Sequence, residues 1–158
     1  MKNRLLPVLL PLLLFQAGFA RCQQLAIQTE SGKQTVLSRS DLEGLPHVKV
    51  SSGSGGAIFE GVDLRAALEK GGVEFGRSMK GKRMASCLLV EAADGYKVVI
   101  ALPEIDPAFN DKQFVLAFLK DGKAMDESEG PYRLVIPDEK RMARWVRQVT
   151  RLKIVEVP

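Results

Sequence analysis

Two apolar runs rich in β-branched residues lie on either side of Asp94-Gly95, in the stretch from Met84 to Asp106. An Asp-Gly pair between two such runs is a strong short-range signal for a β-hairpin. The sequence therefore predicts a β-hairpin whose turn is formed by this pair. Tyr96 directly follows the turn, so we expect its phenol at the hairpin tip, where it can reach a pocket.

The rest of the chain is predicted to form short strands and two brief helices. Ser40, with Glu43 three residues later, predicts a capping box for one helical turn that ends at Gly44. Asp63 is predicted to cap a second helix, which ends at Gly71. This order of elements predicts an α+β domain with a β-rich core of mixed sheets and a few short helices. The further strands are expected at residues 25–29, 34–37, 47–51, 114–120, 133–136 and 149–157.

The first twenty residues have the three parts of a secretory signal peptide. Lys2 and Arg4 form a positive segment, residues 5–15 are apolar, and Gly18-Phe19-Ala20 is a small-residue cleavage site. We therefore expect cleavage after Ala20, which leaves a single domain over residues 21–158. Such a protein would be periplasmic or secreted.

Two other interpretations of the N-terminus fit less well. An uncleaved membrane anchor needs about 20 apolar residues, whereas this run is shorter and contains Pro7 and Pro11. A lipid attached to Cys22 would need a small residue before the thiol, and Arg21 stands there. No second apolar segment is long enough to span a membrane, so we expect no membrane span after signal cleavage.

The charge of the chain argues against a nucleic-acid partner. The formal net charge is +4, and it falls to about +2 when Lys2 and Arg4 leave with the signal. The basic residues nevertheless gather in two groups, each of which is either a solvated face or part of a pocket for an anionic ligand, since guanidinium groups match phosphate oxygens. The first group is Arg77, Lys80, Lys82 and Arg83, and the second is Lys140, Arg141, Arg144, Arg147, Arg151 and Lys153.

Three motifs occur in the order and spacing of a known family. They are Phe59-Glu60-Gly61-Val62-Asp63-Leu64 with Ala67-Leu68, then Asp94-Gly95-Tyr96 with Leu102-Pro103, and then Gly130-Pro131-Tyr132-Arg133 with Arg144-Trp145-Val146. Together they resemble the molybdopterin-binding domain of the sulfite oxidase superfamily, here in a small, stand-alone, exported form. The resemblance covers about residues 37–155 and implies that family's fold.

The resemblance also implies roles for individual residues. Tyr96 falls where sulfite oxidases place an active-site tyrosine beside the oxyanion substrate, which makes it the candidate catalytic residue. Arg141 and Arg144 fall near the basic residues that hold the pterin or its phosphate, so all three should surround one cavity. From the residues alone, Tyr96 is equally well explained as a cross-strand aromatic, and Trp145 is better explained as a core residue than as a ligand.

One departure from the family lies in the loop after the strand predicted at residues 47–51. Family enzymes hold molybdenum there through one cysteine thiolate, a soft ligand that tunes the metal. This loop instead contains Ser51, Ser52 and Ser54 among glycines. A serine hydroxyl is harder and far less acidic than a thiol, so we expect no metal ligand and doubt that molybdenum binds. A molybdopterin stays compatible with the loop, because hydrogen bonds from such cofactor-binding serines can hold its organic part.

The remaining reactive residues suggest no other chemistry. Cys87 lies in an apolar run and is expected to be a small buried hydrophobic residue, or else to pair with Cys22 in a disulfide of an exported protein. His47 is the only histidine, so the sequence offers no histidine cluster for zinc or copper and no strong Ser-His or Cys-His pair.

Two classes of function therefore stay open. The first is a non-catalytic or vestigial binding module whose basic pocket takes a pterin, another small anion or a protein partner. The second is a working molybdopterin-dependent oxidoreductase with unusual metal ligation. An accessory subunit of a redox system is a third alternative.

Overall fold

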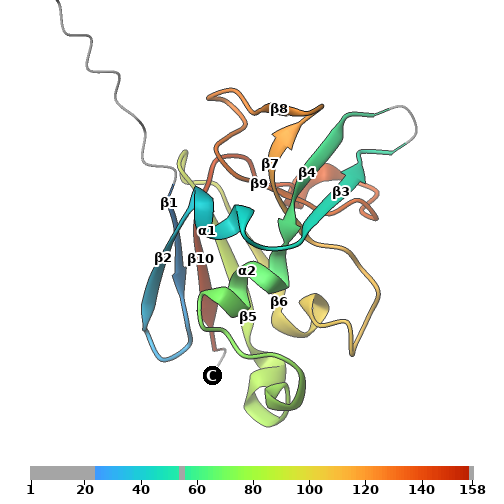
Figure 1. Ribbon diagram of the computed structural model, residues 1–158. Helices are drawn as coiled ribbons and strands as arrows, with labels where there is room; N and C mark the ends of the chain where they lie inside the picture. Colours follow the sequence, from blue (N-terminus) through green and yellow to red (C-terminus); the bar gives the residue numbers. More distant parts are fainter. Residues whose placement is uncertain (1–23, 54–55, 157–158) are drawn as a thin grey trace, which may run out of the picture.

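Ten strands form two five-stranded sheets in the computed structural model, which describes residues 24–53 and 56–156 (Figure 1). In the first sheet, the first and last strands of the chain pair in parallel, and the other neighbours are antiparallel. Its strand order is β2 (Gln34–Ser38), β1 (Gln24–Gln28), β10 (Val149–Val155), β5 (Cys87–Ala92) and β6 (Lys97–Ala101).

The second sheet is antiparallel throughout. Strand β7 pairs with β4 on one side, and on its other side with β9 near its beginning and β8 near its end. The strands are β3 (His47–Ser51), β4 (Ile58–Asp63), β7 (Val115–Lys120), β8 (Lys123–Ala124) and β9 (Arg133–Val135).

The predicted hairpin is present at one edge of the first sheet, where β6 is the edge strand. Strands β5 and β6 pair in the register Glu91↔Lys97, and the turn between them contains Asp94 and Gly95. Gly95 has φ +86°, a left-handed conformation that glycine adopts without steric cost. The Tyr96 amide donates to Asp94 Oδ1 at 2.9 Å, which stabilises the turn.

The cap of the first helix, α1 (Arg39–Glu43), lies two residues before the predicted cap, Ser40. Its N-cap is Ser38, whose hydroxyl accepts from the Asp41 amide at 3.2 Å, while the Asp41 carboxylate accepts from the Ser38 amide at 2.9 Å. The prediction of a capping box at Ser40 and Glu43 is therefore wrong. The reason is that Ser38 still has the extended backbone of β2, and Asp41 stands three residues later, which is the spacing that a capping box requires.

The second helix, α2 (Leu64–Lys70), follows the prediction. Asp63 caps it by accepting from the Ala66 amide at 3.2 Å, and Gly71 ends it. Leu64, Ala67 and Leu68 are buried, so one face of α2 packs into the core.

The core lies against one face of the first sheet and extends to the second sheet, with α1 and α2 between them (Figure 1). Gly61 lies at a register shift between β4 and β7, where a Cβ atom would be 2.1 Å from the Leu116 carbonyl oxygen. Only glycine permits this close approach, which explains its place in the first motif. Fully buried side chains of the first sheet include Leu25, Ile27, Leu88, Val90, Ile100 and Leu152.

Short 3-10 turns complete the described chain, and one of them, η4, borders the site described below. The turns are η1 (Gly76–Ser78), η2 (Gly81–Ala85), η3 (Leu102–Ile105) and η4 (Met142–Arg144). Across the described residues, no helix has both the length and the apolar character needed to cross a membrane.

Candidate functional site

The hairpin tip opens onto a cavity of about 350 Å³, which we call the Tyr96 pocket. The β5–β6 turn contributes Asp94 and Tyr96, and strand β9 contributes Arg133. Turn η4 and the residues after it form the remaining wall. That wall consists of Met142, Ala143, Trp145 and Arg147.

The Tyr96 side chain ties the hairpin tip to η4. Its hydroxyl donates to the Ala143 carbonyl oxygen at 2.7 Å, and the residue is 49% exposed. This bond uses the single proton of the phenol, so in this arrangement its oxygen is left as an acceptor only. The catalytic role of Tyr96 stays a prediction, and donation to an oxyanion would require this bond to break.

Arg133 is the most enclosed cation of the Tyr96 pocket, with a side chain only 11% exposed. Its Nη1 lies 2.5 Å from Glu129 Oε1, and Lys120 Nζ lies 2.9 Å from the other oxygen of that carboxylate. The guanidinium carbon also lies 5.1 Å from the ring centre of Phe59 and 5.8 Å from that of Trp145. Its Nε is buried and has no hydrogen-bond partner. A buried donor without a partner is costly and is the kind of group that a ligand or water satisfies.

Trp145 is a core residue, as the sequence predicts. It is 5% exposed, its Nε1 donates to the Ile136 carbonyl oxygen at 2.9 Å, and its ring meets Phe59 edge-on at 5.8 Å. It lies just after η4, four residues before β10 begins, and not at the start of that strand. One part of its surface still lines the Tyr96 pocket.

The two arginines implied by the resemblance are not the ones that line the Tyr96 pocket. Arg144 binds Glu139 through its Nε at 2.7 Å and through a second contact from Nη2, and it lies 3.7 Å from Glu104. The hydrogen bond to Glu139 raises the pKa of Arg144, and both carboxylates add to this effect although partial burial opposes it. Arg141 is exposed at the start of η4. Their predicted role as pterin contacts stays a prediction.

The arginines that line the Tyr96 pocket are Arg133 and Arg147. Arg147 is exposed and forms no ion pair with any described residue, so its guanidinium is available at the pocket mouth. Arg147 belongs to the second basic group of the sequence, and Arg133 follows Pro131-Tyr132 in the third motif. Those signals indicate a basic surface but do not say which arginines face a cavity.

The serine loop lies away from the lining of the Tyr96 pocket. The Ser51 hydroxyl donates to the Gly53 carbonyl oxygen at 2.8 Å, and the Ser52 amide donates to the Ala57 carbonyl oxygen at 3.0 Å. Ser54 lies outside the described residues. The predicted cofactor-binding role of these three serines stays a prediction.

The thiol of Cys87 lies at the other end of β5 from the Tyr96 pocket. Cys87 is half-buried and forms no disulfide with any residue that the structure describes, and it pairs in register with Val155 and Ala101. Cys22 lies outside the described residues, so the disulfide between these two cysteines stays a prediction.

His47 contacts a carboxylate and an aromatic ring. Its Nδ1 lies 3.1 Å from Glu60 Oε1, and its ring meets Phe118 edge-on at 5.4 Å. Within the part of the chain that the structure describes, no group of three or more His, Cys, Asp or Glu side chains is placed to hold a metal ion.

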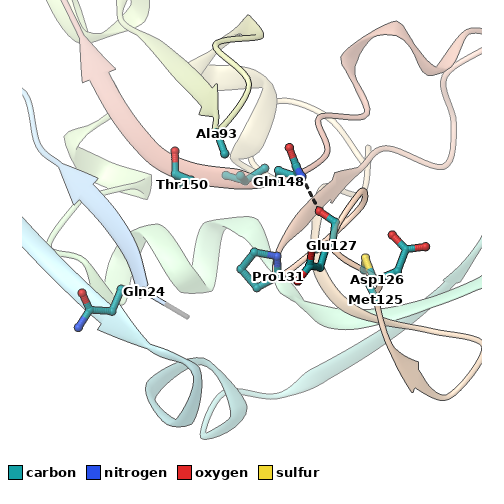
Figure 2. Close-up of a pocket in the computed structure, with 10 residues that line it drawn as sticks. Gln24, Ala93, Met125, Asp126, Glu127, Pro131, Gln148 and Thr150 are labelled. Atoms are coloured by element: carbon teal, nitrogen blue, oxygen red, sulfur yellow. Dashed lines mark hydrogen bonds between the residues drawn. The ribbon is translucent and has the colours of Figure 1, made fainter. Parts of the chain in front are cut away.

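A second cavity of about 330 Å³, which we call the Gln148 pocket, is lined by Gln148, Val149 and Thr150, which follow the last residue of the Tyr96 pocket in the chain (Figure 2). The Gln148 side chain donates to the Glu127 carbonyl oxygen across it (Figure 2). The charged residues of its lining are Asp126 and Glu127, and both are acidic. Apolar walls are formed by Ala93, Met125, Pro131 and Val149.

Comparison with known proteins agrees with this architecture. The family model described as the oxidoreductase molybdopterin binding domain matches residues 30–158. The chain belongs to this family. No curated protein sequence matches it.

A solved structure gives the same fold. The crystal structure of the sulfane dehydrogenase SoxCD from Paracoccus pantotrophus superposes with a TM-score of 0.62 at 23% sequence identity. The match covers 83% of this chain but only 37% of that chain. The chain thus corresponds to little more than a third of the SoxCD chain it matches, and the likeness establishes the sulfite-oxidase-like fold predicted from the three motifs.

Proposed function

We propose that this protein is an exported binding module of the molybdopterin oxidoreductase fold, which holds a small anion in the Tyr96 pocket and does not itself turn over a substrate. The observation that carries the proposal is that two arginines, Arg133 and Arg147, line that pocket. Arg147 is unpaired at the mouth, and Arg133 has a buried Nε without a partner. Both are permanently charged at neutral pH and suit an anion's oxygen atoms.

A metal centre of the sulfite oxidase type does not fit the residues present. The loop that would supply the thiolate contains serines and glycines. Cys87 begins β5, and the Tyr96 turn follows the end of that strand, about five residues and roughly 17 Å further along at about 3.4 Å per residue. A thiolate at that distance cannot share a metal ion with the Tyr96 pocket.

The organic part of a molybdopterin fits the Tyr96 pocket better than the metal does. The volume of about 350 Å³ lies at the lower end of the range for small-molecule sites. Arg147 and Arg133 could hold a phosphate, and the surface of Trp145 could contact a flat ring. When bound, a molybdopterin would carry a dithiolene group that ligates molybdenum.

The alternative is a working oxidoreductase, or an accessory subunit of a redox system. The solved SoxCD structure supports it, because its title names a dehydrogenase. The fold of this chain is shared with that enzyme, but 63% of the SoxCD chain has no counterpart here, since the match covers 37% of it. A working enzyme of this kind would have to hold its metal through residues other than a thiolate of the serine loop.

Metal and pterin analysis of protein purified from its native host separates these two functions. We expect far less than one molybdenum per chain after gel filtration, whether or not oxidation of the extract releases a fluorescent pterin. Close to one molybdenum per chain, retained through gel filtration, would establish the alternative and overturn the proposal. Mass spectrometry of the same sample should give an N-terminus at Arg21, and an intact Met1–Ala20 segment would contradict export by signal cleavage.

A further inference from the structure

The first sheet has a second face, the outer face, which carries the side chains that alternate with those of the core. The strand registers arrange these residues in rows across the sheet. Val36 and Val99 lie on the two edge strands and are each 54% exposed, so the outer face is open at both sides. The rows are Val36, Ala26, Arg151, Glu91 and Lys97; then Gln34, Gln28, Lys153, Leu89 and Val99; then Val155, Cys87 and Ala101.

The middle of the outer face is hollowed. A shallow cavity of about 330 Å³ is lined by Ala26 of β1, Glu91 of β5, Lys97 of β6 and Arg151 of β10, together with neighbouring residues. These side chains come from four adjacent strands. The outer face is therefore accessible across its centre as well as at its edges.

Three basic side chains surround the one acidic side chain of this centre. Lys97 Nζ lies 2.7 Å from one carboxylate oxygen of Glu91, and Arg151 Nη1 lies 3.6 Å from the other. The hydrogen bond from Lys97 lowers the pKa of Glu91 against a smaller effect of burial, and the charges of Arg151 and Lys153 lower it further. Glu91 is thus ionised at neutral pH, and these four residues carry a net charge of +2, three positive and one negative.

An apolar strip lies beside the basic centre. It consists of Leu89 and Val99 in one row and Val155, Cys87 and Ala101 in the next. All five are half-buried or exposed. An exposed apolar patch with charged residues at its rim is typical of a protein interaction surface.

The size of the outer face suits a transient encounter. Five strands about 4.8 Å apart, each about five residues long, give a face of roughly 20 Å by 17 Å. Its area of roughly 340 Å² is less than half of the about 800 Å² that each partner buries in a standard stable interface. Weak encounters between redox or signalling proteins bury less.

We propose that the outer face is the docking surface for an acidic protein partner. Carboxylates of the partner would face Arg151, Lys153 and Lys97, and an apolar side chain would cover Leu89 and Val99. A second copy of this chain is disfavoured, because it would bring two basic centres together. The proposal rests on no residue of the Tyr96 pocket, so the two can fail separately.

Photocrosslinking in the native host locates the partner. A benzophenone amino acid replaces Val99, and the same replacement at Ile58 is the matched control, because Ile58 is 52% exposed on the second sheet. We expect one acidic protein to crosslink from position 99 and not from position 58. That protein is then purified and its affinity for the full mature chain is measured by calorimetry at low and high salt.

Charge reversal provides the decisive comparison. Lys153→Glu should weaken the measured affinity about tenfold or more, and raising the salt should weaken the wild-type complex in the same direction. Lys123→Glu changes the net charge equally but lies on β8 of the second sheet, so it should leave the affinity unchanged. Arg147→Ala should also leave it unchanged, which separates this surface from the Tyr96 pocket.

Four results would overturn the proposal. These are a crosslink to a second copy of this chain, a crosslink to no protein at all, equal effects of Lys153→Glu and Lys123→Glu, and an affinity that does not depend on salt. Cosedimentation with phosphatidylglycerol vesicles that requires Lys153, in the absence of a crosslinked protein, would assign the outer face to a membrane surface instead.

Discussion

The Tyr96 pocket and the Gln148 pocket flank the same segment of chain but present opposite charges. Trp145 and Arg147 line the first, whereas Gln148 and Val149 line the second. The first contains two arginines and one aspartate, and the second contains two acidic residues and no basic one. The same segment therefore borders a cavity with two arginines and an acidic cavity of similar size, and the two differ in the sign of their charge.

The third family motif is divided between the two pockets in the same way. Gly130 and Pro131 line the Gln148 pocket, Tyr132 is fully buried, and Arg133 lines the Tyr96 pocket. A single substitution in this motif can thus affect one cavity and spare the other. The predictions that follow use this separation.

The largest effect is expected for Arg133→Met. The change removes one partner of Glu129 and a cation packed over Phe59 and Trp145, at a side chain that is 11% exposed. We expect a loss of about 2 to 3 kcal/mol in the free energy of unfolding, because Lys120 is then the only ion-pair partner left to Glu129 among the described residues. Urea denaturation measures this loss.

The matched control for that prediction is Arg77→Met. Arg77 is exposed in η1 and should change the free energy of unfolding by less than about 0.5 kcal/mol. Equal stabilities of the two variants would show that Arg133 is not part of a packed cationic site.

A smaller and more selective effect is expected for Arg147→Ala. It should weaken binding of a pterin phosphate to the Tyr96 pocket by about tenfold or more, the value of a charge-assisted contact, while stability changes little. Arg144→Ala is its control, because Arg144 is held by Glu139 and Glu104 outside the pocket lining. Calorimetry that shows a loss of affinity for Arg144→Ala and none for Arg147→Ala would mean that Arg144 contacts the pterin, as the family resemblance implies. The lining of the Tyr96 pocket would then not identify the residues that bind the ligand.

Tyr96→Phe should affect stability more than binding. Without the hydroxyl, the Ala143 carbonyl oxygen loses the bond of 2.7 Å, which contributes about 0.5 to 1.5 kcal/mol. A thermal melt should show a modest decrease in Tm, and affinity for the pterin phosphate should change less than about threefold. A tenfold loss of affinity would instead mean that the phenol rotates and donates to the ligand.

The smallest effect concerns acidification at the Gln148 pocket. Hydrogen bonds from the Ser128 hydroxyl and amide lower the pKa of Asp126 below its ordinary value, with a further contribution from the Glu129 amide. A lowered pKa in the folded state means that the carboxylate stabilises the fold above its unfolded pKa, and that this contribution is lost as the pH falls through the folded pKa. NMR titration of the Asp126 carboxyl carbon should give a midpoint below the ordinary pKa of an aspartate. A midpoint at or above the ordinary pKa would contradict the hydrogen bonding at this turn.

Local signals in the sequence were enough to predict most of the fold. Asp94-Gly95 predicted the β5–β6 hairpin, and Asp63 predicted the start of α2. The start of α1 was wrong because two overlapping Ser-x-x-acid patterns compete, and the strand that precedes the helix selects Ser38. That choice depends on where β2 ends, which pairing with β1 decides.

The lining of the candidate site could be predicted only in part. Tyr96 and the second basic group were both identified, but Arg147 is the one member of that group that lines the Tyr96 pocket. Which arginine faces the cavity depends on contacts between distant parts of the chain. Arg144 forms an ion pair with Glu104, and the Tyr96 hydroxyl donates a hydrogen bond to Ala143, which is 47 residues away. Such pairings have no local sequence signal, so Arg133 was missed as a site residue.

The central claim is that a small anion binds in the Tyr96 pocket and not in the Gln148 pocket. The most direct test is an NMR titration of the mature protein with a pterin monophosphate, following the Trp145 indole proton and the Nε protons of Arg133 and Arg147. Trp145 is the only tryptophan of the chain, so its signal is unambiguous. The account predicts saturable shifts at these three side chains and no shift at the Gln148 side-chain amide; in Arg147→Ala, the shifts at Trp145 and Arg133 should need about tenfold or more ligand to reach half of their final value. Shifts centred on Gln148, or none at any of these positions, would contradict it.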